Sequence, residues 1–276
     1  YEKLVQGTTD AARHGYAPPA FKETTYFDCA VWNQEERRSL YVTVGPGATT
    51  MMGSTDHRVT SRMFLGGTSP VSYEAEHTAV TKTEEVACRP LDNILDGETI
   101  DFLKIDAEGA ELRILQGAKN LLSQQNVLFI KSEFMFLPYY EEHPLLGHQH
   151  VYLADLGYRL IDLDLAHGGY TRNQSRIGDD ADCRIKYGGD AYFIPDPDRC
   201  DLDAMDRQRM AAIALTLGYH SLAVSLLHDA ALLTDREISE IETAVSQVPA
   251  GKKMRLMWNR VPYAVWAGLK RVGIGR

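Results

Sequence analysis

The feature that most constrains the fold is a short apolar segment that runs into acidic residues and a glycine and then into a helical pattern. Residues 101–106 (DFLKID) are largely apolar, as a buried parallel strand would be. In residues 108–123 the apolar positions recur at steps of three and four, which predicts one amphipathic helix. A strand, an acidic bend and a helix in this order favour a sheet with helices packed on its faces.

Other segments extend this alternation of strands and helices. Short β-rich or apolar runs predict further strands at residues 26–32, 39–44, 86–91, 127–130, 159–165 and 190–194. Residues 148–157 predict a helix that ends at Gly157. Because strands and helices alternate, we expect an α/β domain over residues 1–197, built on a parallel or mixed sheet with helices on its faces.

The composition changes after Pro197. Residues 202–247 carry no strand signal and predict helices at about 203–217, 219–233 and 235–247. We therefore expect residues 198–250 to form a helical extension, packed on the sheet domain or on a partner. Residues 251–276 interleave cations with aromatic side chains. This tail is expected either to contact a membrane surface or a partner, or to dock on the protein itself.

Charge and cysteine usage argue against several classes of function. Residues 252–276 hold seven Lys/Arg and no acid, so the residues before them carry 22 Lys+Arg against 38 Asp+Glu. An acidic body repels phosphates, and we expect no nucleic-acid partner. No run approaches the roughly 18 apolar residues of a membrane span, and the start does not read as a signal peptide. The four cysteines lack C-x-x-C spacing, so reduced thiols in a cytoplasmic protein are expected.

Acidic residues fall where strands are predicted to end. Ligands of open parallel sheets bind beyond the carboxyl ends of the strands, where we expect Asp28, Asp106, Glu108 and Glu133. Gly109 would allow the backbone or a ligand to approach closely. A structural alternative makes Asp106 a helix N-cap and Glu108 a partner of the helix dipole. Glu133, beside another carboxylate, suggests a shared proton, a metal or a ligand amine.

Two weaker signals lie in the predicted loops. His143, His148 and His150 have nearby acids and form a possible metal site, although loop residues or substrate contacts are the commoner roles, and we expect no metal. Residues 45–68 are rich in glycine, threonine, serine and methionine. They are expected to form either a substrate lid or a mobile connector.

Residues 100–118, IDFLKIDAEGAELRILQGA, resemble the signature of the FkbM family of S-adenosylmethionine-dependent methyltransferases. Flanking segments are similar to the family in the same order, including FDCAV at 27–31, SLYVT at 39–43 and PLDNIL at 90–95. The resemblance spans roughly residues 1–195, and its central nineteen residues are the specific part.

The resemblance implies a Rossmann-like class I methyltransferase fold, with a mostly parallel sheet that binds S-adenosylmethionine across the strand ends. The implied reaction transfers a methyl group to a hydroxyl of a sugar, glycan or secondary metabolite. The resemblance also places Asp106 and Glu108 beside the methyl and amino-acid end of the cofactor, with Asp106 as the candidate for substrate orientation or general base.

The remaining positions carried over from the resemblance complete the expected site. Asp28, Cys29 and Ala30 are implied to border the adenine, and Glu133 is implied to face the substrate pocket. The catalytic candidates are thus Asp106, Glu108 and Glu133.

Two features that the family's cofactor site needs do not occur in these residues. One is a glycine-rich turn after the first strand, and the other is an acidic residue after the second strand that binds the ribose. The G-x-G at Gly45-Pro-Gly47 does not open a predicted helix and cannot replace that turn. Residues 2–4 resemble the helix that follows the acidic residue. We therefore expect the first two strands to precede Tyr1, and this chain alone to bind the cofactor poorly.

Two alternatives from other classes remain open. In one, the sheet is a degenerate, non-catalytic methyltransferase core whose helical extension and tail bind a partner or a membrane. In the other, the same sheet serves a nucleotide-sugar enzyme, which would require phosphate-binding glycines or a cluster of Arg/Lys at the strand ends, and neither is evident.

Overall fold

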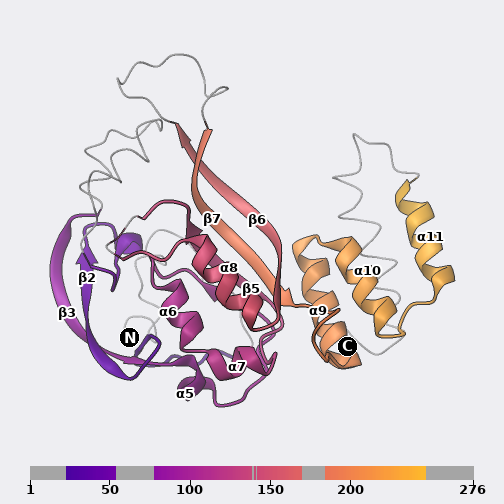
Figure 1. Ribbon diagram of the computed structural model, residues 1–276, viewed down its shortest axis with the longest axis horizontal. Coiled ribbons are helices and arrows are strands. Elements are labelled where there is room, and N and C mark those ends of the chain that lie inside the picture. The colour runs from indigo at the N-terminus through magenta and orange to yellow at the C-terminus, as the bar shows by residue number, and fades with distance from the viewer. Residues whose placement is uncertain (1–22, 54–77, 139, 141, 170–183, 247–276) are drawn as a thin grey trace.

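The structure is a computed structural model that describes residues 23–53, 78–138, 140, 142–169 and 184–246 (Figure 1). Its strands are β1 (Ala30–Val31), β2 (Glu36–Thr43), β3 (Val80–Arg89), β4 (Leu103–Ile105), β5 (Ile130–Met135), β6 (Tyr158–Gly169) and β7 (Arg184–Pro195). Its helices are η1 (Pro46–Ala48), α5 (Leu91–Leu95), α6 (Glu111–Gln116), α7 (Lys119–Ser123), α8 (Leu146–Asp155), α9 (Ala204–Leu217), α10 (His220–Asp229) and α11 (Asp235–Ser246).

The strands form two mixed sheets, with the orders β1-β3-β2 and β4-β5-β7-β6. The pairs β1–β3 and β4–β5 are parallel, whereas β2–β3, β5–β7 and β6–β7 are antiparallel. The α/β class is confirmed, but the described strands do not form the mostly parallel sheet that the resemblance implies. Two of the antiparallel pairs, β2–β3 and β6–β7, join strands that are consecutive among the described elements, and β6 and β7 form a long antiparallel ribbon (Figure 1).

The helical stripe predicted from the sequence forms the centre of the main core. Leu115, Ala118 and Leu122 are completely buried, and they belong to one cluster with Phe134 of β5 and Leu153 of α8. Figure 1 shows α6 and α8 on the same side of β5. Burial of the helix stripe against the strand therefore fixes how the acidic bend before α6 sits relative to the end of β5.

The single helix predicted over residues 108–123 is two short helices, α6 and α7. The interruption lies at Gly117, because a Cβ atom there would stand only 2.2 Å from the backbone oxygen of Trp32. Beyond the interruption, the Asp92 carboxylate accepts hydrogen bonds from the backbone N–H groups of Asn120 and Leu121 at 2.9 and 3.0 Å. A close contact between distant segments thus ends the first helix, and a side chain of α5 supports the start of the second.

The three helices predicted after Pro197 are confirmed as α9, α10 and α11. The first two pack against the four-stranded sheet, where Met210 and Leu226 share a second core cluster with Phe129 and Ile194. Asp203 caps α9 by accepting a hydrogen bond from the backbone N–H of Asp206 at 2.7 Å. Within the described residues, the extension is therefore attached to the sheet.

Several predicted features lie outside the described residues. They are the helical start at residues 1–6, the part of the 45–68 loop beyond Gly53, and the basic aromatic tail at 251–276. Across the part of the chain that the structure describes, no helix has the length and apolar character needed to span a membrane.

Candidate active site

Three acidic side chains meet beyond the carboxyl end of β4, beside the second half of β5. Asp106 directly follows β4, and Glu133 lies one residue beyond Ser132, which is paired with Ile105 in the parallel register. Carboxylate oxygens of Asp106, Glu108 and Glu133 lie within 4.8 Å of one another. The structure therefore brings together three of the four acidic residues that the strand-end argument expected at one edge of the sheet. Asp28, which we expected at the same edge, belongs elsewhere.

The bend that carries Glu108 has an unusual backbone. Glu108 and Gly109 both have positive φ, at 51° and 97°, and for a residue with a side chain this conformation is strained. The buried Glu111 carboxylate holds the bend by accepting hydrogen bonds from the N–H groups of Ala107 and Gly109 at 2.8 and 3.2 Å. The Thr50 hydroxyl adds a hydrogen bond to the backbone oxygen of Glu108 at 2.7 Å.

Replacing Glu111 is therefore expected to release the bend. Glu111→Leu leaves the part-buried N–H of Ala107 and the buried N–H of Gly109 without their acceptor, and it should lower the free energy of unfolding by about 2–4 kcal/mol. Glu111→Gln retains an acceptor oxygen and should cost much less. Urea denaturation of the two variants measures the difference. Equal losses in both variants would contradict the assigned role of the carboxylate.

Two side chains from more distant segments complete the support of the cluster. The Tyr140 hydroxyl donates to the Glu108 carboxylate at 2.7 Å. The fully buried Gln149 of α8 donates to the backbone oxygen of Glu133 and accepts from the Ser132 hydroxyl, both at 2.9 Å. Sequence reasoning missed both residues, and nothing in the pattern of 148–157 distinguishes Gln149 from a solvent-facing position.

Two acids in and beside the cluster, Glu133 and Glu111, have raised pKa values. Burial, reinforced by the negative charges of Glu108 and Glu111, raises the pKa of Glu133 to about 8. Burial likewise raises the pKa of Glu111 to about 6, against the opposing effect of its backbone hydrogen bonds. Glu133 therefore holds a proton through most of the neutral range. Lys131 does not compensate it, because it pairs with Asp190 at 2.9 Å.

Asp106 differs from Glu133 in its surroundings. Its side chain is 47% exposed and pairs with Lys104 of β4. The alternative role of Asp106 as a helix N-cap is wrong, because the N-cap position of α6 is Ala110 and no side chain caps it. The exposed Asp106 carboxylate is thus open to solvent, while Glu133 lies deeper.

Gly109 leaves space that neighbouring side chains use. A Cβ atom at this position would lie 2.7 Å from the Tyr140 ring and 3.1 Å from Cγ of Met52. The missing side chain therefore makes room for Tyr140 and Met52, and the expected close approach of a ligand stays a prediction.

The residues predicted to border the adenine lie on the other sheet. Ala30 begins β1 and pairs with Cys88 of β3, Asp28 is exposed, and Cys29 is a free, partly buried thiol. The structure does not place them in the acidic cluster, and their role toward the adenine remains a prediction.

Two histidines of the predicted loop, His143 and His148, contact neighbouring protein groups. His143 is buried against the Tyr140 ring, with ring centroids 5.4 Å apart, and burial lowers its pKa to about 4. Nδ1 of His148 accepts a hydrogen bond from the Leu145 N–H at the start of α8. Among the described residues, the cluster of potential metal ligands contains the three acids and no histidine.

Comparison with known proteins adds one finding. The family profile described as the methyltransferase FkbM domain matches residues 17–160, just over half of the chain. This match is shorter than the 1–195 expected, and it includes the acidic bend and Glu133. Neither the curated proteins nor the solved structures gave a match. The chain belongs to the FkbM methyltransferase family.

Proposed function

We propose that this protein is an S-adenosylmethionine-dependent O-methyltransferase that methylates a hydroxyl of a sugar, glycan or secondary metabolite. The observation that carries the proposal is the convergence of Asp106, Glu108 and Glu133 beyond the end of β4 and beside β5, in a member of the FkbM family. We also propose residues 1–197 as the catalytic domain and 198–250 as its helical extension.

The chemistry of the donor set fits a cationic ligand. S-adenosylmethionine supplies an electrophilic methyl group on a positively charged sulfonium, and its amino-acid end carries an ammonium. Carboxylates within 4.8 Å of one another repel each other, and a cation beside them relieves that repulsion. Asp106 and Glu108 are the residues that would hold these positive groups, and Asp28, Cys29 and Ala30 are proposed to border the adenine.

We assign the proton transfer to Glu133. In the displacement, the acceptor oxygen forms a bond to the methyl carbon, the carbon–sulfur bond breaks, and the hydroxyl proton passes to a carboxylate. A base works best when its pKa lies near the operating pH, and the pKa of Glu133 is raised to about 8. Asp106 is half exposed and already paired with Lys104, which makes it the better candidate for orienting the acceptor.

Calorimetry with two cofactor analogues tests this proposal on the full-length gene product. Sinefungin carries an ammonium near the position of the sulfonium, whereas S-adenosylhomocysteine has a neutral thioether there. We expect both to bind, and sinefungin to bind about tenfold more tightly at low ionic strength. Absence of binding by either analogue would contradict the assignment as a methyltransferase.

A further inference from the structure

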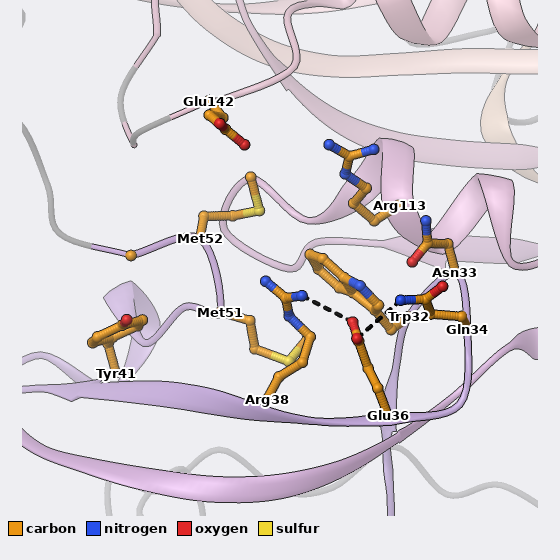
Figure 2. A pocket seen from close by; sticks show the side chains of 11 residues that line it. Trp32, Asn33, Gln34, Glu36, Arg38, Tyr41, Met51, Met52, Arg113 and Glu142 are labelled. Atoms are coloured by element: carbon orange, nitrogen blue, oxygen red, sulfur yellow. Dashed lines mark hydrogen bonds and ion pairs between the residues drawn. The ribbon is translucent and has the colours of Figure 1, made fainter.

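A hollow lies beside Met52, which also approaches Gly109 of the acidic bend. It is a cavity of about 450 Å³, in the range of small-molecule sites, between β2, the loop that follows η1, and α6 (Figure 2). We call it the hairpin pocket. Its lining includes Trp32, Arg38, Met52 and Arg113, and it contains none of the residues assigned above to methyl transfer.

Two guanidinium groups from different elements line the hairpin pocket. Arg38 of β2 lies over the Trp32 ring at 4.1 Å and donates from Nη1 to Glu36 at 2.9 Å. Arg113 of α6 donates to Gln116 at 3.3 Å, and no carboxylate among the described residues pairs with it. Figure 2 shows Arg38 beside the Trp32 ring and Arg113 extending from α6 away from that ring. Guanidinium groups with unused donors favour a planar anion such as a carboxylate.

The rest of the wall is suited to hydroxyl groups. Asn33, Gln34 and Glu142 supply amide and carboxylate groups, and Met51 and Met52 supply apolar surface. Sugars present hydroxyls and apolar C–H faces together, which matches this lining. Glu36 and Glu142 also limit the charge that the pocket accepts. A singly charged carboxylate meets less repulsion there than a doubly charged phosphate.

Two polar atoms of the same wall have no partner. Oδ1 of Asn33 and Nε of Arg38 are buried without a hydrogen bond among the described residues. Unpaired buried polar atoms are rare in proteins, and each calls for an explanation such as a missing water or ligand. One is an acceptor and the other a donor, so a small side-chain rotation would pair both with a hydroxylated anion in the cavity.

The hairpin pocket is connected to the acidic bend by shared side chains. Met52 lines the pocket and lies against Gly109, and Tyr140 lies against Gly109 on the same face. Tyr140 in turn donates to the carboxylate of Glu108. A ligand in the pocket is therefore separated from the catalytic acids by little more than one layer of side chains.

We propose that the hairpin pocket binds an acidic sugar unit of the methyl acceptor, with its carboxylate on Arg38 and Arg113 and its hydroxyls on the amide and carboxylate groups opposite. This inference rests on the proposed function and narrows its substrate class to glycans or glycosides that carry a uronate. The bound unit positions an adjoining hydroxyl toward Glu108 and Glu133.

Binding of methyl glucuronide to the protein tests the proposal without methyl transfer. The probe is titrated into protein labelled with ¹³C at its methionine methyl groups. Methyl glucoside serves as the neutral control ligand and glucose 6-phosphate as the phosphate control ligand. We expect saturable chemical-shift changes at Met51 and Met52 with the glucuronide, and at least about tenfold weaker binding of both control ligands. Equal or tighter binding of either control ligand would overturn the carboxylate assignment.

A pair of arginine variants locates the site. Arg113→Gln should weaken glucuronide binding about tenfold, whereas Arg236→Gln, on the exposed face of α11, should leave it unchanged. Unchanged binding in Arg113→Gln with a native circular dichroism spectrum would overturn the proposal. The glucuronide titration contains no cofactor, so its result does not depend on whether sinefungin binds. The uronate-site proposal and the methyltransferase proposal can therefore fail separately.

Discussion

Replacing Glu133 by glutamine is expected to lower kcat for methyl transfer by about 10²–10⁴-fold, the usual contribution of a general base. Glutamine keeps the shape of the side chain and cannot accept the proton. The matched comparison is Asp106→Asn, at a half-exposed carboxylate that pairs with Lys104. It should affect acceptor binding more than kcat. Rates with a radiolabelled methyl donor measure both variants, and near-normal kcat in Glu133→Gln would contradict the role of this carboxylate.

The pH profile carries the same prediction. The base form of Glu133 is the ionised form, so kcat/KM should rise about tenfold per pH unit below the pKa of about 8 and level above it. Glu133→Gln should lose this dependence. A profile already flat between pH 6 and 8 in the unchanged protein would show that Glu133 does not limit the reaction.

The pH dependence of the free energy of unfolding provides an independent check. Its sign is opposite to that expected for an acid in an ion pair. Because the folded state raises the pKa of Glu133 from 4.5 to about 8, folding favours the protonated form. Its contribution to stability is therefore present below about pH 4.5 and is lost as the pH rises to 8. Glu133→Gln should be more stable than the unchanged protein at pH 9, and close to it at pH 5, in thermal unfolding.

Replacing Gly117 by alanine is expected to lower the free energy of unfolding by about 3 kcal/mol or more. The added Cβ would lie 2.2 Å from the oxygen and 3.0 Å from the carbonyl carbon of Trp32, and both belong to backbone that has no rotamer to change. For a chain of this size the melting temperature should fall by roughly 6–12 °C.

Gly147 provides the control for this variant. It lies in the first turn of α8, and a Cβ atom there meets nothing within 4 Å. Gly147→Ala should be neutral or stabilise the protein by up to about 1 kcal/mol, because alanine favours the helix. Similar melting temperatures for Gly117→Ala and the unchanged protein would mean that the contact between α6 and the segment after β1 is looser than described.

The sequence predicted the features that depend on neighbouring residues. The acidic positions after 101–105 and near the end of the next strand are local patterns, and so are the helices after Pro197. Their positions followed from periodicity and from the rule that ligands bind at strand ends. Parallel and antiparallel pairing is not a local property, and the β6–β7 ribbon could not be distinguished from two separated strands.

Contacts between distant segments explain what the sequence did not predict. The helix ends at Gly117 because Trp32 approaches it, and the bend is held in part by Thr50 and Tyr140, which lie far from it in the chain. The raised pKa of Glu133 likewise depends on burial and on the negative charges of Glu108 and Glu111, in the bend and at the start of α6. None of these can be read from a window of neighbouring residues.

The central claim is that Glu133 belongs to an acidic cluster that receives a cation, and a ¹³C-NMR titration of its side-chain carboxyl tests it most directly. The resonance, assigned by its absence in Glu133→Gln, should titrate with a pKa of about 8 in the free protein. It should shift to lower pH by about one unit or more when sinefungin is bound, because a nearby ammonium favours the carboxylate. Titration near pH 4.5 with no response to sinefungin would contradict the account.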